Sequence, residues 1–366
     1  MKMQAAVLWR AHGPLEVLEV DLEPPRKREV LVKVAATGVC ASDLHVFDGD
    51  LPRRLPLVPG HEAAGTIVEV GDGVESLAPG DHVVLSLVPA CGRCPACRRG
   101  RPVLCERAAV MATRGTLADR STRLSVNGTT IHHFNSVSSF AEYAVVPEAG
   151  AVRISPDVPL EIAALVGCAV LTGVGAVFNT AGVEAGASVA VFGCGGIGLN
   201  VVQGARLAGA SPIVAVDVKT EKLELARRLG ATAAVDATAV DAAEAVIDAT
   251  NGGVDYAFEA LGGEATIQQA WRATRAGGTT VVVGLMPKGR LLTIDPWYFG
   301  WEKTLRGCYL GSARPAVDVP RLIDLYRSGE LRLDEIVSHR LPLAELSEAL
   351  ERLRAGEAAR QLVVFE

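Results

Sequence analysis

The chain lacks several features that would mark it for export, for a membrane or for nucleic acid. Its first ten residues, MKMQAAVLWR, have neither the apolar core nor the small-residue cleavage site of a signal peptide. The apolar stretch at residues 162–178 contains glycines and is shorter than a membrane span needs. There is no long basic run, and 36 basic residues stand against 42 acidic ones. We therefore expect a cytoplasmic protein with no nucleic-acid or membrane partner.

Internal repeats and low-complexity tracts are also absent, and what is present is typical of a large globular protein. A chain of 366 residues is long for one domain, so two domains are expected. The hydrophobic content of 49% and the 38 glycines favour a well-buried α/β protein. In a cytoplasmic protein the eight cysteines favour metal ligands or reactive thiols over disulfides.

A glycine-rich turn joins a predicted strand to a predicted helix in the middle of the chain, and a second strand follows. The first glycine of its G-x-G-x-x-G pattern permits the tight turn, and the second lets backbone N–H groups approach a pyrophosphate. The third lets the helix pack against its strand, and the helix N-terminus faces the phosphates with a partial positive charge. The pattern predicts a dinucleotide-binding turn formed by Gly193, Gly195, Gly196, Ile197 and Gly198.

An acid stands where the second strand ends. Asp217 lies nineteen residues after Gly198, where its carboxylate would accept hydrogen bonds from the adenosine ribose hydroxyls. The same carboxylate would repel a 2′-phosphate, so NAD(H) is favoured over NADP(H). Lys222, five residues further on, is either a ribose contact or a solvated helix lysine.

The two halves of the sequence differ in their pattern of predicted secondary structure. Residues 1–35 alternate in the manner of strands, whereas from residue 188 onward strands and helices alternate, which predicts a doubly wound parallel sheet. We expect a β-rich domain over residues 1–170 and 308–366 and a nucleotide-binding domain over 171–307. Two helices and a last strand, 361–365, would end the chain.

A thiol and two imidazoles lie close together in the first domain. Zn²⁺ prefers sulfur and imidazole ligands, and a catalytic zinc ion keeps one position open. Cys40 and His61 could supply two ligands, and the third must come from elsewhere in the chain. A buried free cysteine and an unrelated histidine would explain either residue alone.

Four cysteines follow in a C-x2-C-x2-C-x7-C run. Four thiolates within fifteen residues can close a tetrahedral cage with no open position, which is typical of a structural zinc site. An iron–sulfur cluster is the competing interpretation, although no proline follows the last cysteine and no second set occurs. The predicted ligands of a structural zinc ion are Cys91, Cys94, Cys97 and Cys105.

Residues 112–139 form a polar insertion that contains Asn127-Gly128, a strong hairpin signal. The neighbouring pair His132 and His133 does not indicate a metal site, because adjacent residues of a strand point to opposite faces.

With these motifs in place, the chain resembles the zinc-dependent medium-chain alcohol dehydrogenases over essentially its whole length. The segment 60–74 matches the zinc signature of that family, G-H-E-x2-G-x5-G-x2-V, and the four-cysteine run and the glycine turn follow at the family's spacing. The resemblance implies a GroES-like catalytic domain and a Rossmann domain, two zinc ions per chain and NAD.

The resemblance also implies roles for individual residues. Cys40, His61 and Cys168 would bind the catalytic zinc ion, with Glu62 beside the metal. Asp43 would orient a ligand imidazole. Ser42 is similar to the family hydroxyl that takes the alcohol proton and passes it through the cofactor ribose to His45. Thr172 would touch the nicotinamide, and Arg360 resembles the arginine that binds the pyrophosphate.

The implied activity is reversible hydride transfer between a primary alcohol and NAD. Leu87, Phe134 and Leu285 match pocket positions of the family and are apolar, which favours an apolar or aromatic alcohol. The long insertion resembles that of the glutathione-dependent formaldehyde dehydrogenases, yet Ala109 stands where those enzymes carry an arginine for the substrate carboxylate. A nicotinoprotein that never releases its cofactor is a further alternative. The insertion also favours a homodimer over a tetramer.

Overall fold

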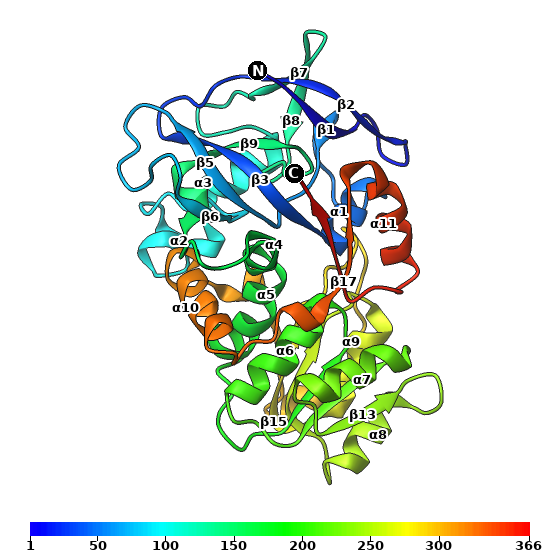
Figure 1. Cartoon of the computed structure of the whole chain (residues 1–366). Helices are drawn as coiled ribbons and strands as arrows, with labels where there is room; N and C mark the ends of the chain where they lie inside the picture. The colour runs from blue at the N-terminus through cyan, green and yellow to red at the C-terminus, as the bar shows by residue number, and fades with distance from the viewer. The chain divides into compact units, whose positions relative to one another are not determined.

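The computed structural model describes all residues, 1–366, and divides the chain into two compact units. Unit 1 comprises Met1–Cys168, Arg314–Gly329 and Val337–Glu366, and unit 2 comprises Ala169–Ala313 and Glu330–Ile336. Figure 1 shows the chain coloured from its N-terminus to its C-terminus. The chain returns to unit 1 six residues later than the sequence predicts, and a short segment near residue 333 goes back to unit 2.

Unit 1 is rich in antiparallel strands, as its alternating sequence predicts. Five strands form a closed barrel in the order β1 (Lys2–Leu8), β2 (Leu15–Leu22), β7 (Leu124–Val126), β8 (Thr129–His133) and β4 (Leu57–Val58). A second sheet of unit 1 has the order β10 (Ala151–Arg153), β6 (His82–Leu85), β5 (Ala63–Val70), β3 (Glu29–Val39), β18 (Arg360–Val364) and β17 (Val337–Leu341), and β9 (Tyr143–Pro147) also pairs with β3.

Strand β3 organises this second sheet because it pairs with three partners. Its side chains pack with those of β5 and β6 in a buried aliphatic cluster that includes Val32, Ile67 and Val83. The last strand of the chain, β18, pairs with the end of β3, so that Gln361 lies opposite Val39. The sequence predicts β18 but not β17, which pairs with it in parallel.

Unit 1 contains six α-helices, of which α10 is the longest with 13 residues. They are α1 (Ala41–Phe47), α2 (Pro95–Arg98), α3 (Glu106–Arg114), α4 (Leu160–Ala164), α10 (Pro315–Arg327) and α11 (Leu346–Arg354).

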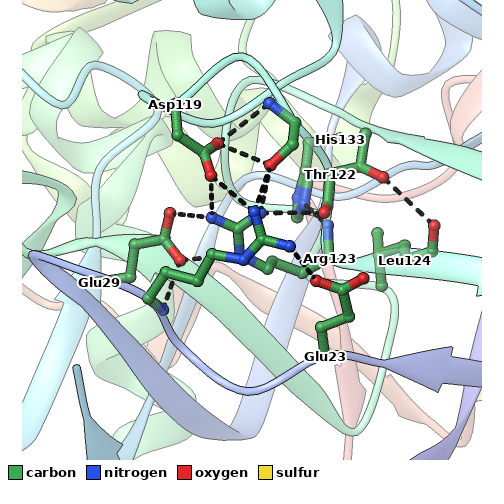
Figure 2. A network of polar contacts seen from close by, with 9 residues as sticks. Glu23, Glu29, Asp119, Thr122, Arg123, Leu124 and His133 are labelled. Atoms are coloured by element: carbon green, nitrogen blue, oxygen red, sulfur yellow. Dashed lines mark hydrogen bonds and ion pairs between the residues drawn. The ribbon is translucent and has the colours of Figure 1, made fainter.

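The polar insertion contains the predicted hairpin, in which Asn127 and Gly128 adopt left-handed backbone conformations between β7 and β8. A buried arginine at its base fixes it to β3 (Figure 2). Arg123 is 1% exposed and forms two hydrogen bonds with the Glu29 carboxylate, at 2.6 and 2.9 Å, and one with Asp119, at 2.8 Å. The Arg123 backbone N–H donates to Nε2 of His133 at 3.2 Å. Since charges are buried only when they are paired, this network ties the insertion firmly to the sheet.

Unit 2 is a doubly wound parallel sheet, which confirms the predicted fold class. Its helices contact each other in pairs, α6 (Gly196–Leu207) with α7 (Thr220–Leu229) and α8 (Ala242–Ala249) with α9 (Glu264–Ala273). The strand order is β13 (Ala233–Asp236), β12 (Ile213–Asp217), β11 (Val189–Phe192), β14 (Val254–Glu259), β15 (Thr274–Val282) and β16 (Thr304–Gly307). The helices are α5 (Ala169–Gly175), α6 (Gly196–Leu207), α7 (Thr220–Leu229), α8 (Ala242–Ala249) and α9 (Glu264–Ala273).

No single helix of the chain is long and apolar enough to cross a membrane, although the bent pair 160–167 and 169–181 passes that test by length and composition.

Candidate functional site

Unit 1 brings together three predicted metal ligands that are far apart in the sequence. Cys40 follows β3 and is the N-cap of α1, His61 precedes β5, and Cys168 precedes α5. Their ligand atoms and one Glu62 oxygen all lie within 4.8 Å of one another, and all four residues are buried. All eight cysteines of the chain are free thiols. Two thiols and an imidazole at this spacing suit Zn²⁺ and leave a fourth position for another ligand.

Asp43 holds both the histidine and the loop around it. Its Oδ1 lies 3.2 Å from Nδ1 of His61 and accepts a hydrogen bond from the Gly60 N–H, while Oδ2 accepts one from the Cys40 N–H at 3.0 Å. Burial lowers the pKa of His61, but the Asp43 carboxylate and the Cys40 side chain together more than offset this and raise the pKa to about 10. The carboxylate therefore favours a proton on Nδ1, which leaves Nε2 to face the metal site.

Cys40 favours the thiolate form. A hydrogen bond from Cys168 holds the pKa of Cys40 well below its usual value, and the positive charge of Arg360 adds to this effect, although burial opposes it. A thiolate is the form that binds a metal ion.

Glu62 is held by an arginine from the other end of the chain. The Arg360 guanidinium forms two hydrogen bonds with the Glu62 carboxylate, one of them from Nε to Oε1 at 2.9 Å, and both side chains are buried. Gly38 makes room for this pair, because a Cβ atom at that position would lie 2.5 Å from Oε1 of Glu62. The sequence places Arg360 at the pyrophosphate, and its ion pair with Glu62 is a contact that sequence reasoning missed.

Ser42 and His45 project from α1 beside the ligands. The Ser42 hydroxyl lies 3.1 Å from Nε2 of His61 and 3.4 Å from Sγ of Cys40. His45 is 19% exposed at its side chain and lies 3.4 Å from the Asp50 carboxylate, measured from Nδ1. A hydroxyl beside the metal ligands and an imidazole nearer to solvent are thus on the same short helix.

Phe134 packs against the metal site from the barrel side. Its ring is fully buried and meets the His61 ring edge to face, with 5.4 Å between the ring centroids. Leu87, also predicted for the pocket, is buried in unit 1. Leu285, the third predicted pocket residue, belongs to unit 2 and is 43% exposed.

The four remaining predicted ligands form a second group in unit 1. The sulfur atoms of Cys91, Cys94, Cys97 and Cys105 lie within 4.8 Å of one another. Backbone N–H groups of Cys97 and Glu106 lower the pKa of Cys94 to about 6. Four thiols that can all face one point close a tetrahedral site, so this group suits a structural zinc ion.

The glycine turn of unit 2 has the geometry that the sequence predicts. Gly193 has a φ of +94°, and a Cβ atom on Gly198 would lie 1.7 Å from the Gly193 carbonyl oxygen. Gly195 caps α6, which begins at Gly196 and Ile197, and nothing lies within 4 Å of a Cβ atom placed on Gly195. This space and the free N–H groups of the helix N-terminus suit a pyrophosphate.

Asp217 ends β12 beside this turn. One carboxylate oxygen accepts a hydrogen bond from the Cys194 N–H at 2.7 Å, and the other accepts bonds from the next two N–H groups of the chain. The acid thus fixes the glycine turn. Lys222 is half-buried near the start of α7, and Thr172 is buried in α5.

The comparisons with known proteins agree with this architecture. The family model for the alcohol dehydrogenase GroES-like domain matches residues 26–156, and the model for zinc-binding dehydrogenases matches residues 196–328. The chain is 39% identical to the class-3 alcohol dehydrogenase of Cereibacter sphaeroides and 38% identical to the S-(hydroxymethyl)glutathione dehydrogenase of Escherichia coli, in each case over the full length of both chains.

A solved structure gives the same result. Benzyl alcohol dehydrogenase from Acinetobacter calcoaceticus is similar over the whole of both chains, with a TM-score of 0.95 and 34% identity. The matches confirm the predicted pairing of a GroES-like domain with a Rossmann domain, two zinc sites and a nicotinamide nucleotide as cofactor. The chain therefore belongs to the zinc-dependent, medium-chain alcohol dehydrogenases.

Proposed function

We propose that the protein catalyses reversible hydride transfer between a primary, apolar or aromatic alcohol and NAD, with the aldehyde and NADH as products. One observation carries this proposal: the buried set of Cys40, His61 and Cys168, beside a Glu62 carboxylate that Arg360 already binds. Three protein ligands leave a coordination position for a substrate oxygen, whereas the four-cysteine group leaves none.

The residues around this set would each have a separate role in the reaction. Cys40, His61 and Cys168 would hold the catalytic zinc ion, which supplies Lewis acidity that lowers the pKa of an alcohol. The Asp43 carboxylate keeps the His61 ring in one orientation. Ser42, whose hydroxyl lies beside the ligand His61, would accept the hydroxyl proton, and the partly exposed His45 would release it to solvent. The buried Phe134 and Leu87 keep water away from the reacting atoms.

Unit 2 would bind the cofactor. The turn from Gly193 to Gly198 offers backbone N–H groups to the pyrophosphate, and the Asp217 carboxylate would accept hydrogen bonds from the ribose and reject a 2′-phosphate. Thr172, Lys222 and Arg360 are further proposed cofactor contacts. The proposal predicts a preference for NAD over NADP that Asp217→Ser reduces.

A panel of alcohols with NAD, followed at 340 nm before and after treatment with a chelator, tests the proposal. Chelator-sensitive oxidation of benzyl and long-chain primary alcohols is the expected result. Complete inactivity towards every alcohol and aldehyde, in protein that holds two zinc ions and binds NAD, would contradict it.

A second candidate is a dehydrogenase for the adduct of formaldehyde with a thiol such as glutathione. The full-length similarity to the S-(hydroxymethyl)glutathione dehydrogenase favours it, whereas Ala109, an exposed residue of α3, offers no charge for the glutathione carboxylate. Formaldehyde oxidation that requires glutathione would support this candidate over the first. Absorbance at 340 nm in the freshly purified protein, with no exchange of cofactor, would instead support a nicotinoprotein.

A homodimer is the proposed assembly. Strand β16 is the edge of the parallel sheet, and the segment that precedes it exposes Trp297, Phe299 and Trp301. An unpaired edge beside exposed aromatic side chains suits pairing with a second copy. Sedimentation at several concentrations separates a dimer from a tetramer or a monomer.

A further inference from the structure

The segment that carries the four cysteines, residues 91–114, has an unusual charge, and we call it the zinc lobe. It contains six arginines and a single acid, Glu106, in a chain whose net charge is −6. Four thiolates around one Zn²⁺ carry two net negative charges. Together with Glu106 they give the lobe three negative charges against six positive ones. The positive excess lies on the surface, because all six arginines are exposed: Arg93, Arg98, Arg99, Arg101, Arg107 and Arg114.

These arginines have no partners within the chain. None of the six takes part in an ion pair or donates a side-chain hydrogen bond. Of the 23 arginines elsewhere in the chain, at least 14 form an ion pair. Exposed guanidinium groups that repel one another are stabilised when an outside anion binds among them.

Two aliphatic side chains stand among the arginines. Leu104 is 42% exposed and Val110 is 49% exposed. On α3, Arg107, Val110 and Arg114 follow at intervals of three and four residues, so they share one face, and the buried Ala108 and Met111 face the protein. The surface thus combines a rigid, metal-held frame, apolar contacts and guanidinium groups, which is the composition of a protein–protein interface.

We propose that this face of the zinc lobe, on α2 and α3 of Figure 1, is a docking surface for an acidic segment of another protein. Carboxylates accept the two-pronged hydrogen bonds of guanidinium groups, and aliphatic residues between them would cover Leu104 and Val110. A single-stranded nucleic acid fits less well, because residues 91–114 contain no aromatic side chain on which bases could stack.

The test uses the full-length, zinc-loaded protein and three fluorescein-labelled probes. The probes are a peptide of glutamates interspersed with leucines, an all-glutamate peptide of the same length, and a double-stranded oligonucleotide. Fluorescence anisotropy at about 0.1 M salt, where the screening length is about 10 Å, measures each affinity. We expect the leucine-containing peptide to bind most tightly.

The variant Arg98→Gln/Arg99→Gln/Arg107→Gln is expected to weaken binding of this peptide about tenfold or more, since several charged contacts are lost together. The matched control, Arg10→Gln/Arg227→Gln/Arg290→Gln, removes three exposed arginines outside the lobe and should change the affinity less than twofold. Leu104→Ser/Val110→Ser should weaken the leucine-containing peptide and leave the all-glutamate peptide unaffected. Zinc content and Tm are measured for every variant, and single substitutions replace any triple variant that loses zinc.

Four results would overturn the proposal. The first is no peptide binding by the unmodified protein, and the second is equal weakening in the control variant. The third is tighter binding of the oligonucleotide, which would indicate a phosphate polymer. The fourth is a change of oligomeric state in the lobe variant, which would indicate that the partner is a second copy of the chain.

Discussion

The two cysteine sites of unit 1 use the same ligand chemistry in opposite ways. The zinc lobe takes four ligands from fifteen consecutive residues and lies at the surface, whereas the catalytic set takes its ligands from residues 40, 61 and 168 and is buried. A local loop can close around a metal by itself, but the catalytic set exists only when the strands around it have paired. We therefore expect metal binding by the four-cysteine set to depend on local structure, and metal binding by the catalytic set to depend on the folding of the whole unit.

Removal of one ligand from each site gives the largest contrast. Cys168→Ser should lower kcat/KM about 10³-fold, since a Lewis acid contributes several kcal/mol to the transition state. Cys97→Ser should instead lower Tm while the remaining activity stays zinc-dependent. Metal analysis should find one of two zinc ions lost in each variant, and Cys308→Ser, which removes a thiol from neither site, should lose none. Loss of both ions from Cys168→Ser would contradict the independence of the sites.

The Glu62–Arg360 pair tests whether the catalytic set depends on distant strands. Arg360→Met leaves a buried carboxylate without a partner, and the free energy of unfolding should fall by about 3–5 kcal/mol. Glu62→Gln/Arg360→Met should recover most of this loss. The exposed pair of Arg354 and Asp48 is the control, because Arg354→Met should cost less than about 1 kcal/mol. Equal losses in the single and double variants at the buried pair would refute the argument.

The Asp43 carboxylate contacts a ligand of the catalytic set, so its removal should affect the two zinc sites differently. Asp43→Asn should weaken zinc binding at the catalytic set about 10- to 100-fold, because the orienting bond to His61 is lost. The zinc lobe has no such carboxylate partner and should retain its ion. Competition with a chromogenic chelator measures both affinities, and an unchanged affinity at the catalytic set would remove Asp43 from the mechanism.

Acid provides the mildest test, because a buried histidine that is not a predicted metal ligand, His133, responds to it. Burial lowers the pKa of His133 to about 3. The unfolded chain binds this proton near pH 6.5 and the folded chain only near pH 3, so stability is present above pH 6.5 and is lost as the pH falls between these values. This histidine alone should cost about 2 kcal/mol between pH 7 and pH 5.

The variant His133→Gln should flatten this slope while acid release of zinc stays unchanged. Denaturation midpoints at several pH values, with zinc content measured in parallel, separate the two effects. An identical pH slope in the variant would assign the loss of stability to other groups.

The contrast between the sites also explains what the sequence could predict. The zinc lobe and the turn from Gly193 to Gly198 are local, so residue type and spacing were sufficient. Residue type and position made Cys40 and His61 candidate ligands, but Cys168 came only from a family resemblance, because nothing in the sequence places it beside His61. Neither the pairing of Arg360 with Glu62 nor the return of the segment near residue 333 to unit 2 has a local signal. A glycine inside a strand, Gly38, was the one available sign that something approaches β3 closely.

The Glu62–Arg360 pair also has a consequence for biosynthesis. The ribosome completes the four-cysteine set at Cys105, but it adds Arg360 and the rest of β18 only after all of unit 2 has been made. At about 5–20 residues per second, roughly 13 to 51 seconds separate these two events. During that interval β3 has no β18 to pair with, and the buried carboxylate of Glu62 has no cation. Maturation of the catalytic centre therefore waits for the synthesis of residue 360, although its first ligand is residue 40.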